Sequence, residues 1–310
     1  MTWWEALILG IIQGVTEFFP VSSSGHLVMG SDALGLQLPG VVFEVCVHVA
    51  TLVSVLIVYR RRIQALLLGL LGRPNGDEHA RSYLFGLVLA SVPAAFVGFL
   101  FKDWFEARFS DPAFAATMLL VTGCMVWSIR WAPEKGKLKL IDVLPIAGAG
   151  LVSVVAGRGI SFVVVLGILA AVMGIARATA SQEWHSRPSP ICAIMMGVAQ
   201  AVAILPGISR SGSTVLAGTW RRLNPAAAAE FSFLMSVIVI SAAGLLMVPD
   251  AIEAGEAIGV GPLLVGCAAA MVSGILAIRF FLVLLRRQSF HVFAYYCWFV
   301  GCLFLLLTRR

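Results

Sequence analysis

Two short segments of the chain combine side-chain types that could act on a phosphate group. The first, QGVTEFFPVSSSGH, spans residues 13–26 and holds a glutamate, three serines and a histidine. The second, PGISRSGST, spans residues 206–214 and holds three serines, a threonine and an arginine. A carboxylate base, a hydroxyl nucleophile, an imidazole and a guanidinium suit phosphoryl transfer, because its transition state spreads negative charge over the phosphate oxygens.

Each of these side chains has a definite chemical capacity. Gln13 and Glu17 are four residues apart, so in a helix they share one face. Glu17 could act as a general base or hold a divalent cation, and Ser23 could attack phosphorus. His26 could move a proton or attack phosphorus itself, and Arg210 could grip a phosphate with two N–H groups. We favour Ser23 as the nucleophile, with His26 and water as the alternatives.

The other small and polar residues of the two segments are expected to bind the substrate. Backbone N–H groups and hydroxyls that converge on one point form anion sites. The predicted substrate-binding residues are Gln13, Ser22, Ser24, Gly25, Ser209, Ser211 and Thr214.

Structural roles are the alternative explanation for several of these residues. Ser22 and Ser24 could serve interhelical packing, and Glu17 could form a structural ion pair with Arg210. His48 is alone in an apolar segment, so we interpret it as a packed or hydrogen-bonded residue rather than a ligand. Glu44 and Glu230 either line the cavity or cap helix starts; the sequence does not separate these two roles.

The composition places these polar segments in a membrane protein. The 310 residues are 60% hydrophobic and 12% charged, with a mean hydropathy of +0.95. Nearly continuous apolar runs indicate helices rather than the alternating strands of a barrel. The predicted core transmembrane helices are 41–59, 82–100, 114–129, 226–248, 261–285 and 290–307.

The remaining composition adds partners and exclusions. The segment MTWWEALILG lacks the basic leader of a signal peptide, so we expect it to remain in the mature fold. The six cysteines are scattered through apolar runs, which indicates packing. The net charge of +6 lies mostly in loops, so it favours contact with the lipid bilayer, and no nucleic acid partner is expected.

Basic loops give the helices their expected directions, because short cytoplasmic loops are rich in Lys and Arg. The topogenic residues Arg60, Arg61 and Arg62 place the 60–81 loop inside, so helix 41–59 runs inward. Arg221 and Arg222 precede helix 226–248, so that helix runs outward.

An internal repeat relates the two polar segments. A shift of 187 positions (200 − 13) aligns Gln13 with Gln200, and residues 22–25 with residues 209–212. The helices that follow run in opposite directions, which indicates an inverted-topology repeat. We predict an all-α polytopic fold. Its first repeat is 1–139 with a re-entrant hairpin at 3–30, its second is 191–310 with a re-entrant hairpin at 191–219, and an added helical pair lies at 140–190.

The chain resembles the undecaprenyl-diphosphate phosphatase family, the bacitracin-resistance type of bacterial membrane enzyme. The matching segments are QGVTEFFPVSSSGH, FEV at 43–45, LPGISRSGST and AAEFSFLMSV. The resemblance implies removal of the terminal phosphate from undecaprenyl diphosphate, which yields the carrier lipid for peptidoglycan. It also implies six membrane helices with two re-entrant hairpins, an active site open to the outer (periplasmic) face of the bacterial inner membrane, and a divalent cation, Mg²⁺ or Ca²⁺.

The resemblance also assigns residues. The family's catalytic positions fall on Glu17, Ser23, His26 and Arg210, and its other motif hydroxyls fall on Ser22, Ser209 and Thr214. Where the family has Glu or Gln, this chain has Gln13, which leaves Glu17 as the one carboxylate that could bind the metal. The lipid diphosphate is then expected to supply most of the metal's ligands.

Two further possibilities stay open at this point. Inverted repeats with broken helices at mid-membrane are typical of transporters, so a polyprenyl-phosphate transporter is the alternative function. A homodimer is among the assemblies that the sequence allows.

Overall fold

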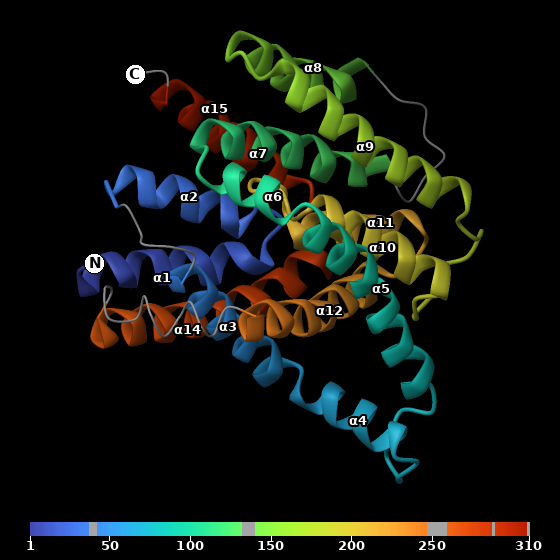
Figure 1. Ribbon diagram of the computed structural model, residues 1–310. Helices are drawn as coiled ribbons and strands as arrows, with labels where there is room; N and C mark the ends of the chain where they lie inside the picture. Colours follow the sequence, from blue (N-terminus) through green and yellow to red (C-terminus); the bar gives the residue numbers. More distant parts are fainter. Residues whose placement is uncertain (37–41, 132–139, 247–258, 287–288, 309–310) are drawn as a thin grey trace.

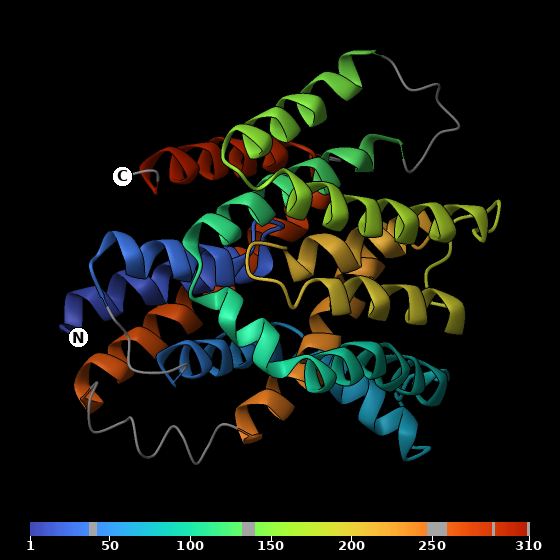
Figure 2. The same ribbon diagram turned by 45° about the horizontal axis from the view of Figure 1, so that its top comes forward.

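The computed structural model describes residues 1–36, 42–131, 140–246, 259–286 and 289–308. These ranges are helical and contain no strand, apart from one isolated bridge between His185 and Leu223. Figures 1 and 2 show helices packed around two short helical hairpins that point toward each other from opposite ends.

The first hairpin consists of α1 (Trp3–Phe18) and α2 (Ser23–Ala33). Helix α1 begins with a capping box in which Thr2 and Glu5 bond reciprocally. It ends just before Pro20, whose ring restricts the preceding residue to an extended conformation. Helix α2 starts again at once, because the Ser22 side chain caps it. The polar motif therefore lies at the tip of the hairpin.

The second hairpin repeats this plan with α10 (Pro190–Val202) and α11 (Arg210–Trp220). Ser189 caps α10 and Ser209 caps α11. Pro206 interrupts the chain between the two helices. The two hairpins approach from opposite ends of the molecule and their tips meet in its interior (Figures 1 and 2).

Six helices correspond to the predicted core spans within a few residues. They are α3 (Val42–Val58), α5 (Ala80–Leu100), α7 (Pro112–Trp127), α12 (Pro225–Leu246), α14 (Val260–Arg286) and α15 (Val292–Leu307). Five helices of the described chain are long and apolar enough to cross a membrane, or six if α3 and its neighbour α4 (Arg60–Leu70) count as one bent span. The all-α polytopic fold class is therefore confirmed, whereas the re-entrant character of the hairpins stays a prediction.

Two helices fill the predicted extra segment. They are α8 (Leu140–Val155) and α9 (Gly159–Ala178), and they lie at the edge of the molecule beside α7 (Figure 1). Arg158, between them, pairs with Asp111 at the start of α7 at 2.9 Å. Their status as an addition to the repeat stays a prediction.

Two short helices were not predicted. Helix α4 (Arg60–Leu70) bends away from α3 by 74°, and α6 (Lys102–Phe109) follows α5, where the sequence suggested loops. Their charged residues hid the helical pattern. Arg62 of α4 bonds Glu230 of α12 at 2.8 Å and Asp77 at 2.5 Å. Glu230 thus ties α4 to α12; neither of the two roles suggested for it describes this position.

Small residues fix the helix that carries the first motif. Helix α1 packs against α14 along Gly10 and Gly14. A methyl group added at Gly10 would collide with the backbone of Gly266, and one at Gly14 would collide with Ser273. Close backbone approach through small residues is a common way for membrane helices to associate. This contact sets the position of Glu17, one turn further along α1.

Candidate active site

The two hairpin tips are joined through Ser22. Its hydroxyl accepts hydrogen bonds from the N–H of Gly25 at 3.3 Å, in its own hairpin, and from the N–H of Gly207 at 3.1 Å, in the other. A Cβ added at Gly25 would lie 2.9 Å from the Gly207 Cα, and Gly207 has φ +95°. These glycines therefore let one backbone approach the other.

The second tip is held by hydroxyls of its own and by α7. Ser209 accepts from the Gly212 N–H at 3.0 Å, and Ser211 donates to the Phe19 carbonyl at 2.9 Å. Thr122 of α7 donates to the Gly207 carbonyl at 2.7 Å and accepts from the Ser209 N–H at 3.1 Å. Sequence reasoning missed Thr122, because a lone threonine in an apolar helix resembles many packed threonines.

Glu17 lies at the centre of the polar cluster. Its Oε2 accepts from the Ser23 hydroxyl at 2.6 Å and from the Gln13 amide at 3.0 Å. Its Oε1 accepts from Arg210 at 2.5 Å. The carboxylate is 7% exposed, so burial makes these partners necessary for its charge.

Arg210 comes from the opposite hairpin and is anchored on two sides. One terminal nitrogen bonds Glu17, and the other donates to the Ser232 carbonyl of α12 at 3.2 Å. Thr214 supports this anchor, since its hydroxyl bonds Ser232 at 2.6 Å and the Arg210 carbonyl at 2.8 Å. Within the described chain these bonds use two of the five guanidinium N–H groups, so a phosphate could engage others.

His26 lies apart from this cluster. Its Nδ1 is 2.8 Å from the Ser22 carbonyl, and its Nε2 is 2.9 Å from the Tyr296 hydroxyl of α15. The two rings also stack, with centroids 5.6 Å apart. Both ring nitrogens thus have partners, and no described hydrogen bond joins His26 to Glu17 or Ser23.

A different histidine faces the carboxylate. The Nε2 of His48 in α3 lies 3.5 Å from Glu17 Oε2. The sequence suggested a packed residue here, because no periodicity relates residue 48 to the motif. Its proximity depends on how α3 packs against α1, which only the fold reveals.

The structure therefore divides the predicted residues into two groups. Gln13, Glu17, Ser23 and Arg210 are connected directly, and Ser23 is half-buried rather than enclosed. The other group builds the junction between the tips or ties the tips to neighbouring helices. Its members are Ser22, Ser24, Gly25, His26, Ser209, Ser211 and Thr214.

The cluster does not fit a divalent cation held by protein groups alone. Both oxygens of Glu17 already accept hydrogen bonds, one of them from a guanidinium. Nowhere in the described ranges do three or more His, Cys, Asp or Glu side chains gather as possible ligands. Gln13 Oε1 is buried and has no partner in that part of the chain, but a single amide oxygen does not complete a site.

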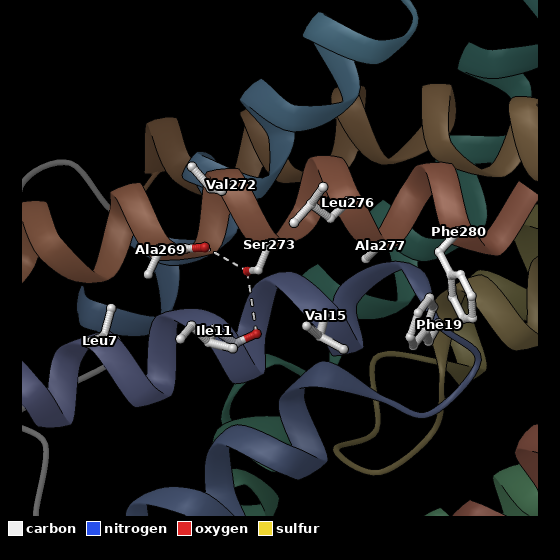
Figure 3. A pocket seen from close by; sticks show the side chains of 10 residues that line it. All are labelled: Leu7, Ile11, Val15, Phe19, Ala269, Val272, Ser273, Leu276, Ala277 and Phe280. Atoms are coloured by element: carbon white, nitrogen blue, oxygen red, sulfur yellow. Dashed lines mark hydrogen bonds between the residues drawn. The ribbon is translucent and has the colours of Figure 1, made fainter.

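An apolar groove of about 560 Å³ lies elsewhere, between α1 and α14 (Figure 3). Of its ten lining residues, only Ser273 has a polar side chain, and that hydroxyl bonds the Ala269 carbonyl at 2.6 Å. The groove offers no acid, base or cation, so the chemistry belongs to the hairpin tips.

Known proteins match this chain along nearly its whole length. The family model described as bacitracin resistance protein BacA matches residues 6–161 and 141–303. An undecaprenyl-diphosphatase of Desulfatibacillum aliphaticivorans is 33% identical over 97% of this chain and 97% of its own. One of Gemmatimonas aurantiaca is 35% identical over 96% of this chain and 94% of its own. One of Halothermothrix orenii is 32% identical over 98% and 97%.

Proposed function

The chain belongs to the bacitracin resistance protein BacA family, and we propose that it hydrolyses undecaprenyl diphosphate to undecaprenyl phosphate and inorganic phosphate. It is a multi-pass membrane phosphatase that recycles the carrier lipid for cell-wall synthesis and confers resistance to bacitracin. The observation that carries the mechanism is the direct chain of contacts from Ser23 through Glu17 to Arg210.

The contact between Ser23 and Glu17 suits nucleophilic attack. The Ser23 oxygen bonds to the terminal phosphorus, and the bond from that phosphorus to the bridging oxygen breaks. The lipid monophosphate leaves, and the Ser23 proton passes to Glu17 Oε2 across the 2.6 Å hydrogen bond. Water then attacks the phosphoserine, and the bond from phosphorus to the Ser23 oxygen breaks. That oxygen takes its proton back from Glu17, and both protons of the water leave with inorganic phosphate as H₂PO₄⁻.

Arg210 supplies the positive charge that this transfer requires. Its guanidinium neutralises charge on the non-bridging oxygens from a half-buried position, where electrostatic effects are stronger than in water. Because Arg210 pairs with Glu17 in the structure, the diphosphate and Glu17 share this cation when the substrate binds. Arg210 thus pairs with Glu17 alone in the substrate-free protein, and with both Glu17 and the diphosphate when the substrate is bound.

The contacts of His26 favour Ser23 over this histidine as the nucleophile. Both nitrogens of His26 are engaged with Ser22 and Tyr296, whereas the Ser23 hydroxyl is bonded to a base. We assign to His26 the support of the first tip. Direct attack by water is the remaining alternative.

Several finer features are part of the same proposal. The divalent cation implied by the family resemblance, Mg²⁺ or Ca²⁺, would be held mainly by the diphosphate, since the protein residues do not form a site for it. Chelation should then lower activity without lowering the thermal stability of the substrate-free protein. We place the protein in the bacterial inner membrane with its site open to the periplasmic side. Assembly as a homodimer stays a prediction.

The test is release of phosphate from undecaprenyl diphosphate by the purified protein in detergent. Detergent leaves no second compartment, so a transporter, which has no support among the relatives, would bind the lipid without releasing phosphate. We expect release that both Glu17→Ala and Arg210→Ala abolish. Finding a trapped phosphate on His26, or none under rapid quenching, would overturn the assignment of Ser23.

A further inference from the structure

His48 makes two contacts that fix its ring. Its Nδ1 lies 2.6 Å from the Glu44 carbonyl, one turn back in α3, and its Nε2 lies 3.5 Å from Glu17 Oε2. The side chain is 25% exposed, so it is neither fully packed in the core nor free in solvent. A residue that only fills space would not need its outer nitrogen aimed at a buried carboxylate.

The first contact determines which nitrogen faces Glu17 and in what state. A carbonyl oxygen can only accept, so Nδ1 carries a hydrogen and donates it to Glu44. Nε2 is then the nitrogen that meets the carboxylate. Glu17 must be ionised to accept the Ser23 proton, so Nε2 attracts Oε2 when it too carries a hydrogen and the ring is a cation.

The second contact identifies the atom on which His48 acts. Oε2 is the oxygen that accepts from Ser23 at 2.6 Å, while Oε1 is taken by Arg210. Gln13 also donates to Oε2, at 3.0 Å, from within α1. His48 therefore holds, from another helix, the same oxygen that receives the Ser23 proton.

We propose that His48 is a positioning residue of the active site, which orients Glu17 Oε2 toward Ser23 through its Nε2. The proposal rests on the proposed phosphatase function. In this arrangement Arg210 fixes one oxygen of the carboxylate, and Gln13 with His48 fixes the other from two sides. A base held at both oxygens stays aligned with the nucleophile throughout the transfer.

The geometry supplies a matched pair of variants. In His48→Asn the amide occupies the place of Nδ1 and can still bond the Glu44 carbonyl, but it cannot reach Glu17. In His48→Gln the longer side chain carries an amide N–H to about the place of Nε2. The two variants are similarly polar, so a purely structural role would not separate them. His79→Ala serves as a control, because this histidine is exposed between α4 and α5.

The experiment measures kcat and KM for phosphate release from undecaprenyl diphosphate by the full chain in detergent, per unit of folded protein. We expect His48→Asn and His48→Ala to lower kcat by about tenfold to a hundredfold, the scale of losing one polar contact to a charged group. KM should change much less than kcat. The kcat values of His48→Gln and His79→Ala should stay within about threefold of that of the unsubstituted protein.

Four results would count against the inference. An unchanged kcat in His48→Asn would overturn it, as would a kcat in His48→Gln as low as in His48→Ala. A fall in folded protein or thermal stability with normal kcat would show that His48 is structural. If the unsubstituted chain releases no phosphate, the proposed function fails first, and the inference falls with it.

Discussion

The two hairpins share a backbone plan and differ in the chemistry that they carry. Ser22 caps α2 through the Gly25 N–H, and Ser209, 187 positions later, caps α11 through the Gly212 N–H. Both tips follow a short helix that ends near a proline, and each buries its capping serine against the other tip. The two repeats therefore resemble each other most in the residues that cap the helices and end them.

The same alignment separates the functional side chains. Ile204 lies where the first hairpin has Glu17, and Arg210 lies where it has Ser23. The acid and the nucleophile thus come from one half, and the cation comes from the other. A symmetric scaffold can therefore hold one asymmetric site, because the two tips meet and only the first carries the base.

Removing one serine hydroxyl from each tip should have very different effects on catalysis. Ser23→Ala should lower kcat by about a thousandfold or more, as is typical when a nucleophile is removed, and no phosphoenzyme should form. Ser211→Ala should keep most of the activity, because among the described residues that hydroxyl bonds the Phe19 carbonyl and Ser209 and neither Glu17 nor Arg210. Quenched-flow measurement with labelled substrate distinguishes the two variants. Equal losses would show that both tips carry chemistry.

The next effect concerns the guanidinium that the second hairpin contributes. Arg210→Lys keeps the charge but loses the planar fork, which bonds Glu17 and Ser232 at once. We expect kcat to fall by about tenfold to a hundredfold, in line with the loss of one charge-assisted hydrogen bond. Arg73→Lys, in the exposed loop after α4, is the control. Full activity in Arg210→Lys would mean that any positive charge suffices.

Separating the tips should cost stability. In Gly25→Ala the new methyl group would lie 2.9 Å from the Gly207 Cα, so the tips must move apart. We expect the free energy of unfolding to fall by about 1–3 kcal/mol, as for other overpacked sites. Gly174→Ala in α9 is the matched control, because nothing lies within 4 Å of its added methyl group. Thermal unfolding in detergent compares the two, and equal midpoints would refute the close junction.

The smallest effect separates the two equivalent glutamines. Gln13 donates to Glu17, whereas neither amide atom of Gln200 has a partner in the described ranges, although both are buried. Gln200→Leu should therefore leave stability unchanged or raise it by about 1 kcal/mol, since a buried unpartnered polar group is unfavourable. Gln13→Leu should lower kcat about tenfold by freeing Glu17. Activity and thermal unfolding measured on both variants check this, and equal behaviour would contradict it.

Much of the fold could be predicted from the sequence, because an apolar run or a proline determines the conformation of its own segment. The six core helices and both hairpins follow from hydropathy and from Pro20 and Pro206. Helix α4 was missed, since three arginines at its start resemble a loop. In a helix so short, they mask its apolar face.

The candidate site could be predicted only in part, because some of its contacts join residues that are far apart in the sequence. Residue type and spacing brought Glu17 and Ser23 together, because one hairpin carries both. They could not show that the Ser22 hydroxyl bonds the opposite tip, or that His48 of α3 faces Glu17. Both contacts depend on how separate helices pack, and neither leaves a pattern along the chain.

If the two hairpins form a single site, Glu17 of the first and Arg210 of the second should be energetically coupled in catalysis. The measurement is kcat for phosphate release in Glu17→Gln, in Arg210→Gln and in the double variant, with the folded fraction determined for each. Residues that act as a unit have non-additive effects. Our account predicts that the double variant is about as slow as the slower single variant. If the two losses multiply instead, the hairpins contribute independently and the claim is contradicted.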